Sequence, residues 1–99
     1  MSKTALITGA AGGLGQALAL DLAKLGYALI LTDRDESTLH SVAATVTTAC
    51  EIIVADLRSP QDLDRLCQRI EDPANTVDLL INNAGIGVPG SVVDINADL

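Results

Sequence analysis

The chain has 99 residues, 48% of them hydrophobic, so it can bury one core and we expect one domain over residues 1–99. Six basic against thirteen acidic side chains give a net charge of −7, which disfavours nucleic acid and anionic membranes as partners. The cysteines have no zinc-type spacing and no apolar run reaches roughly 18 residues, so we expect no metal site and a soluble cytoplasmic protein with reduced cysteines.

A glycine-rich turn separates the first predicted strand from the first predicted helix. The strand is the apolar run from Thr4 to Ile7, and four of the seven residues from Gly9 to Gly15 are glycines. From Leu14 onward, leucines recur at helical spacing, at Leu18, Leu22 and Leu25. A backbone without Cβ atoms lets a large anion approach, and the first turn of a helix attracts it. This order predicts a dinucleotide phosphate site.

A second strand and helix follow directly. The nearly continuous apolar run from Tyr27 to Thr32 is typical of a strand covered on both faces in a parallel sheet. Asp33 ends this strand, and Asp35 can cap the next helix. The apolar positions of that helix are Leu39, Val42, Ala43 and Val46. The chain thus repeats the unit of strand and helix.

The third and fourth predicted strands are Glu51 to Ala55 and Val77 to Ile81. Between them, Ser59 followed by Pro60 is a strong helix start, and Pro73 stops the helix. The expected buried face of this helix contains Leu63, Leu66, Cys67 and Ile70. Right-handed crossovers predict a parallel sheet with strand order 3-2-1-4 and helices on both faces, a Rossmann-like three-layer α/β fold.

Asp33 is a candidate ligand of the adenosine ribose, since it ends the second strand 18 residues beyond Gly15. A carboxylate there accepts hydrogen bonds from the ribose hydroxyls and repels a 2′-phosphate by about 1 to 4 kcal/mol. Arg34 could neutralise part of that repulsion or pair with a phosphate. NAD is therefore favoured, NADP stays open, and a solvated loop acid is the alternative for Asp33.

Two further polar segments end strands at the same edge of the sheet. Asp56 could accept the exocyclic amine of adenine while Leu57 packs on its ring, and the alternative is an acid at a helix entry. Asn82 and Asn83 stand beside Gly85, where an amide can connect strand ends and the backbone can pass close to ribose. A plain polar turn is the alternative there.

Two of these segments resemble motifs of the short-chain dehydrogenase/reductase family. The family's Thr-Gly-x-x-x-Gly-x-Gly motif is matched by Thr8, Gly9, Gly13 and Gly15. The Thr-Gly-x-x-Gly-x-x-Gly motif of the extended, epimerase-like subgroup is matched through Gly9, Gly12 and Gly15. The Asn-Asn-Ala-Gly segment from Asn82 to Gly85 is typical of the standard dehydrogenase subgroup, so it favours that subgroup over the extended one.

The resemblance implies the N-terminal, dinucleotide-binding portion of an NAD(P)-dependent oxidoreductase that acts on an alcohol or carbonyl. By this resemblance Asp56 and Leu57 match the adenine-contacting pair, and Asp33 matches the ribose-binding acid of NAD-preferring members. Gly12 stands where NADP-preferring members often carry a basic residue, which supports NAD. The expected cofactor-binding residues are Thr8, Gly9, Gly12, Gly13, Leu14, Gly15, Asp33, Arg34, Asp56, Leu57, Asn83, Ala84 and Gly85.

The catalytic residues of the family cannot be assigned in this chain. The family uses a tyrosine with a lysine four residues later, whereas Tyr27 is followed at that distance by Leu31. Asn96 comes only 11 residues after Gly85, too early for the family's catalytic asparagine. We therefore expect no catalytic residue, no turnover by this chain alone, and a doubly wound fold truncated after four strands.

Two expectations concern partners. In the family more parallel strands follow the fourth, so Val77 to Ile81 would be an uncovered apolar edge. We expect a homo-oligomer formed through that edge or by exchange of residues 86–99. The substrate would be a small molecule. A noncatalytic nucleotide-sensing or interaction module is the alternative function.

Overall fold

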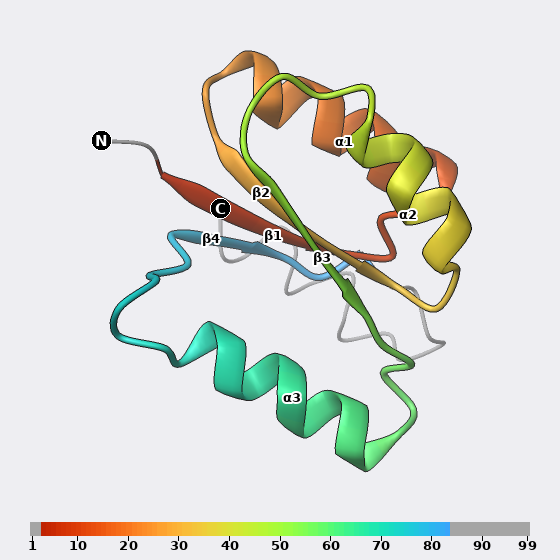
Figure 1. Ribbon diagram of the computed structural model, residues 1–99, viewed down its shortest axis with the longest axis vertical. Helices are drawn as coiled ribbons and strands as arrows, with labels where there is room; N and C mark the ends of the chain where they lie inside the picture. Colours follow the sequence, from red (N-terminus) through yellow and green to blue (C-terminus); the bar gives the residue numbers. More distant parts are fainter. Residues whose placement is uncertain (1–2, 84–99) are drawn as a thin grey trace.

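Three helices alternate with four strands in the computed structural model, which describes residues 3–83 (Figure 1). The elements in chain order are β1 (Thr4–Thr8), α1 (Gly13–Lys24), β2 (Ala28–Asp33), α2 (Glu36–Ala43), β3 (Cys50–Val54), α3 (Pro60–Ile70) and β4 (Leu79–Ile81). The predictions for Ala84, Gly85, Asn96 and the exchange of residues 86–99 fall outside the described residues.

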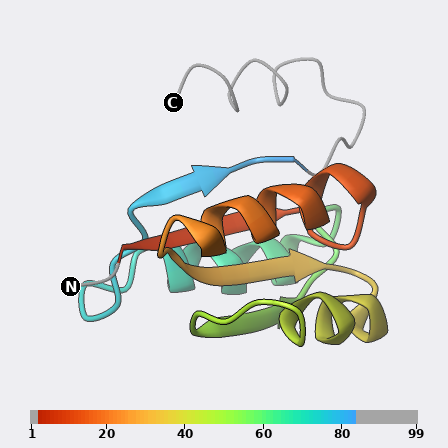
Figure 2. The ribbon, with the colours of Figure 1, turned by 90° about the horizontal axis from the view of Figure 1, so that it is seen from above.

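The four strands form one parallel sheet in the order β3-β2-β1-β4. Helices α1 and α2 cover one face and α3 covers the other, so the described part has three layers (Figures 1 and 2). Each connection between strands that are consecutive in the chain contains a helix, and the one through α3 runs from one edge of the sheet to the other. The predicted Rossmann-like α/β fold and its strand order are confirmed.

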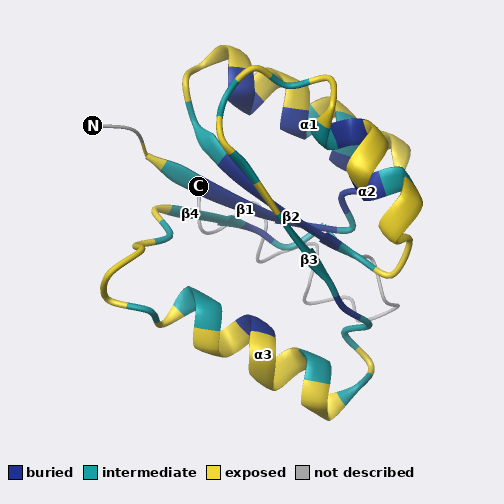
Figure 3. Cartoon of the chain, viewed as in Figure 1, coloured by how far each residue is buried: buried dark blue, intermediate teal, exposed yellow. Residues whose placement is uncertain are grey.

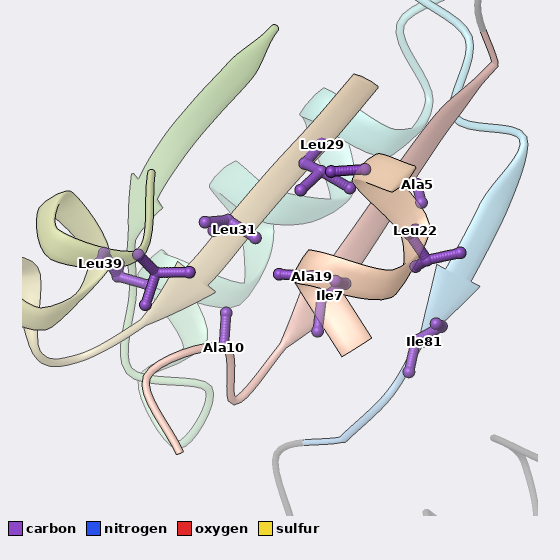
Figure 4. Close-up of a cluster of buried hydrophobic side chains, with 11 residues drawn as sticks. Ala5, Ile7, Ala10, Ala19, Leu22, Leu29, Leu31, Leu39 and Ile81 are labelled. Atoms are coloured by element: carbon purple, nitrogen blue, oxygen red, sulfur yellow. The ribbon is translucent and has the colours of Figure 1, made fainter. Parts of the chain in front are cut away.

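The two central strands send alternate side chains to opposite faces of the sheet. Ile7 and Leu31 belong to the cluster under α1 and α2, whereas Leu6 and Ile30 belong to the cluster under α3 (Figure 4 shows the first cluster). All four are buried. Period-two alternation of apolar residues on both faces explains why the sequence contains nearly continuous apolar runs here.

The ends of several elements differ from the predicted ones. Strand β4 begins at Leu79 and not at Val77; just before it, the Asp78 carboxylate accepts the Thr4 N–H at 2.8 Å and the Asp78 N–H donates to the Thr4 carbonyl at 2.8 Å. Strand β3 spans Cys50–Val54, one residue earlier than expected, and β2 spans Ala28–Asp33. Helix α2 ends at Ala43, so Val46 packs against the core from the following loop.

The predicted buried face of α3 is wrong in two of its four positions. Leu66 is 3% exposed and Ile70 is half-buried, but Leu63 is 44% exposed and Cys67 is exposed as well. Within residues 3–83, α3 is the one helix on its face, so it packs on the sheet along a narrow strip (Figure 3). Apolar spacing identified the helix, but the width of its contact depends on neighbouring helices.

Candidate dinucleotide-binding site

The predicted site residues gather where parallel strands end. Thr8 pairs with Thr32 in register, and Asp33 pairs with Val54, so β1, β2 and β3 finish at one edge of the sheet. Strand β4 joins them through the pairing of Ile7 with Ile81. In open α/β sheets ligands bind outside this carboxyl edge.

The glycine turn between β1 and α1 is held by backbone hydrogen bonds. Gly9 has φ of +67°, a conformation that side chains rarely permit, and its carbonyl accepts the Gly12 N–H at 3.1 Å. The Ala10 N–H donates to the Thr32 carbonyl at 3.2 Å, which connects the turn to β2. Gln16, a residue that the sequence did not single out, donates from Nε2 to the Ala11 carbonyl at 2.8 Å.

The four glycines of this turn have different structural roles. A Cβ added at Gly15 would lie 2.8 Å from the Ala10 Cα and closer still to the Gly9 carbonyl oxygen, so α1 could not approach the turn. At Gly12 the nearest atom would lie 3.5 Å away, and at Gly13 nothing lies within 4 Å. The folded chain itself therefore requires glycine at Gly9 and Gly15, whereas a Cβ at Gly12 would make an ordinary contact and a Cβ at Gly13 would meet open space.

Helix α1 begins without a side-chain cap. Its N-cap is Gly12 and its first turn contains no acidic residue, whereas Asp35 and Ser59 cap α2 and α3 with side-chain oxygens. The first N–H groups of a helix have no partner within the helix, and the helix dipole adds positive charge there. Leu14, in the same turn, is 65% exposed. This end of α1 can thus bind an anionic group and offer an apolar contact beside it.

Asp33 is held against the glycine turn. Its Oδ2 accepts the Ala11 N–H at 3.1 Å, and its Oδ1 accepts the N–H groups of Arg34 at 2.6 Å and Asp35 at 3.4 Å. A carboxylate has about four acceptor positions, so Oδ2 retains capacity for a ligand hydroxyl. The structure therefore places the expected ribose acid in contact with the expected phosphate turn.

Arg34 is exposed at the same edge. No salt bridge joins it to another residue in the range 3–83, and its positive charge contributes to the lowered pKa of Asp56. Its guanidinium therefore lies within electrostatic range of Asp56, which follows the end of β3.

Asp56 forms a bidentate salt bridge with Arg58. Arg58 Nε lies 3.1 Å from Oδ1, and Nη2 lies 3.1 Å from Oδ2. The side-chain hydrogen bonds from Arg58, followed by the bond from its N–H and the charges of Arg58 and Arg34, lower the pKa of Asp56, with burial opposing them. Leu57 is partly buried and packs against the hydrophobic cluster under α3. The Asp56 carboxylate is thus ionised and oriented by a residue that the sequence reasoning missed.

Thr8 connects the ends of β1 and β4. It is 3% exposed, and its Oγ1 accepts the Asn83 N–H at 2.8 Å. The hydroxyl also donates toward Asn82 Oδ1 at 3.1 Å and the Ile81 carbonyl at 3.4 Å. Thr8 is therefore engaged within the protein, and it sets the position of Asn83 relative to the glycine turn.

Residues 3–83 contain neither a metal-binding cluster nor a membrane-spanning helix. Over residues 3–83, no group of three or more histidine, cysteine or acidic side chains is arranged to hold a metal ion. No helix in the same range is long and apolar enough to cross a membrane. Cys50 and Cys67 are both free thiols.

Comparison with known proteins points in one direction. Residues 3–98 match the family described as short chain dehydrogenase. The oxidoreductase UcpA of Escherichia coli K12 is 36% identical over 98 residues, which are 97% of this chain and 37% of UcpA. The chain spans less than half the length of the curated relatives it matches.

Solved structures show the same likeness. A short-chain dehydrogenase from Sphingobium yanoikuyae in complex with NADPH aligns with a TM-score of 0.78 and 39% identity, covering 84% of this chain and 34% of that protein. The 3-ketoacyl-(acyl-carrier-protein) reductase from Brucella melitensis complexed with NADH aligns with a TM-score of 0.72 and 30% identity, covering 97% and 43%. Similar proteins therefore carry either dinucleotide.

Proposed function

This chain belongs to the short-chain dehydrogenase family of oxidoreductases and corresponds to the N-terminal portion of a family member, and we propose that it binds the dinucleotide for an alcohol or carbonyl oxidoreductase. One observation carries the proposal. The Asp33 carboxylate contacts the Ala11 N–H of the glycine turn at 3.1 Å. A carboxylate that suits ribose hydroxyls is thus in direct contact with a turn that suits phosphate.

The described residues fit a dinucleotide. The open space at Gly13 and the uncapped start of α1 suit the pyrophosphate, and Asp33 Oδ2 suits a ribose hydroxyl. Asp56 suits the adenine amine, and the exposed Leu14 suits an apolar contact. When bound, the nicotinamide supplies the hydride acceptor or donor. The contributions of Ala84 and Gly85 stay predictions.

We expect NAD to bind more tightly than NADP. The Asp33 carboxylate would repel a 2′-phosphate, and Arg34 offsets part of that repulsion, so a preference of about fivefold or more is expected. Titration of the chain with each dinucleotide in a calorimeter measures the ratio. Tighter binding of NADP would reverse the cofactor assignment, and no binding of either would refute the proposed function.

We propose that this chain binds without turning over substrate. Its one tyrosine, Tyr27, precedes β2 and therefore lies at the amino edge of the sheet, away from Asp33. The substrate of the whole protein is proposed to be a small alcohol or carbonyl compound, and its location the cytoplasm. The two free thiols support the cytoplasmic location, where cysteines stay reduced.

We also propose that the chain forms a homo-oligomer through β4. Among residues 3–83, this strand pairs with β1 alone, so the N–H and C=O groups on its outer side have no strand partner. An unpaired edge is a template for another chain. Light scattering at high protein concentration is expected to detect dimers or larger species. A monodisperse monomer would contradict this proposal.

A further inference from the structure

In the loop after β3, the backbone and the side chain of Asp56 are held by different hydrogen bonds. The Asp56 N–H donates to Asp62 Oδ2 at 2.8 Å, and the Ser59 N–H donates to the Asp56 carbonyl at 2.9 Å. These bonds hold the backbone without the Arg58 side chain. The Asp56 carboxylate is held by Arg58, through Nε, Nη2 and its own N–H.

The salt bridge leaves the two oxygens of Asp56 unequal. Oδ1 accepts two hydrogen bonds from Arg58, one from the N–H at 2.9 Å and one from Nε at 3.1 Å. Oδ2 accepts a single bond, from Nη2 at 3.1 Å. Since each carboxylate oxygen has two acceptor positions, one position on Oδ2 stays open.

The exposure of the pair decides what Arg58 can contribute. The Arg58 side chain is 65% exposed and that of Asp56 is 34% exposed, so the salt bridge adds little to the stability of the fold. A planar guanidinium that forms two parallel bonds nevertheless restricts the rotation of the carboxylate. The pair is therefore better suited to orienting Asp56 than to stabilising the protein.

We propose that Arg58 is a positioning residue that presents Asp56 Oδ2 to the exocyclic amine of adenine. The inference rests on the proposed dinucleotide function. Without the guanidinium, the Asp56 carboxylate keeps only the bond from the N–H of residue 58 to Oδ1, so Oδ2 is less restricted and ordering it during binding costs affinity. Ordering it beforehand is expected to tighten adenine binding about two- to tenfold. In hypoxanthine a carbonyl replaces this amine, and because O6 is an acceptor it cannot donate to Oδ2; the one ring donor, N1–H, lies at the neighbouring position. The ordered carboxylate is therefore expected to favour adenine.

The test compares NAD with nicotinamide hypoxanthine dinucleotide, in which a carbonyl replaces the adenine amine. Arg58→Met is expected to weaken NAD binding about two- to tenfold and to leave the hypoxanthine analogue unchanged. Arg58→Lys is expected to behave like Arg58→Met, since an ammonium group cannot form two parallel bonds with a carboxylate. Lys24→Met, at the far end of α1, removes the same charge and should leave both dissociation constants unchanged.

Five results would overturn the inference. Unchanged or tighter NAD binding by Arg58→Met would show that Arg58 is neutral or competes for Asp56. Equal weakening of both ligands, or full rescue by Arg58→Lys, would show an effect of charge and not of geometry. Equal binding of both ligands by the unaltered chain would refute the contact with the amine. If the unaltered chain binds neither ligand, the proposed function fails first and this inference fails with it.

Discussion

Replacing Gly15 with alanine is expected to lower the free energy of unfolding by about 2 to 3 kcal/mol and to remove dinucleotide binding. The new Cβ would lie 2.8 Å from the Ala10 Cα, 3.0 Å from the Gly9 carbonyl carbon and closer still to the Gly9 oxygen. All three are backbone atoms, so the clash is relieved only if α1 moves away from the turn. Urea unfolding and calorimetric titration measure the two effects.

Gly13→Ala is the matched control, two residues earlier in the same helix. Nothing lies within 4 Å of a Cβ at Gly13, and alanine is the better helix former, so stability should hold or rise by up to about 1 kcal/mol. Dinucleotide affinity should still fall, because the methyl group would enter the space that a phosphate needs. Equal destabilisation by the two substitutions would contradict the division of roles among these glycines.

Replacing Asp33 with asparagine is expected to weaken NAD binding at least about tenfold and to weaken NADP binding less. A hydrogen bond to a charged group contributes about 1.5 to 3 kcal/mol, and asparagine loses the charge at unchanged shape. The variant also removes the repulsion of a 2′-phosphate while Arg34 remains. Titrating the variant and the unaltered chain with both dinucleotides gives the change in the ratio of the NAD and NADP dissociation constants.

The control for Asp33→Asn is Asp35→Asn. The Asp35 carboxylate caps α2, accepting the Thr38 N–H at 3.1 Å and the Thr38 hydroxyl at 2.7 Å. Asparagine is an equally good cap, so stability should change little while the same charge is removed two residues away. The ratio of NAD to NADP affinity should not change. A similar shift in both variants would mean that net charge, and not the ribose contact, sets the preference.

Asp33 shows how far sequence reasoning reached at the site. Its position after a buried strand and a glycine turn predicts a ribose-binding acid, because the carboxyl ends of neighbouring parallel strands meet at one edge. The contact with Ala11 joins residues 22 positions apart, and no residue pattern signals it. The pairing of Thr8 with Asn83 spans 75 positions. Both depend on strand register, which the apolar pattern does not specify residue by residue.

Arg58 was missed for a different reason. An arginine two residues after an aspartate is unremarkable in a loop, and its role depends on which rotamer brings two nitrogens to two oxygens. Asp62 did carry a local signal, because it stands three residues after the helix cap Ser59, as in a capping box. Its actual bond reaches back to Asp56, beyond that motif.

Residue patterns along the chain were enough to predict the order of strands and helices, the parallel sheet and the sheet edge at which we propose the dinucleotide site. These follow from local rules: apolar periodicity, glycine-rich turns and helix caps act within a few residues. The packed fold was needed to show which glycines it requires, how Asp33 and Asp56 are oriented, and how little of α3 is buried. Those properties depend on distances between atoms that the chain brings together from remote positions, and packing, not spacing, sets such distances.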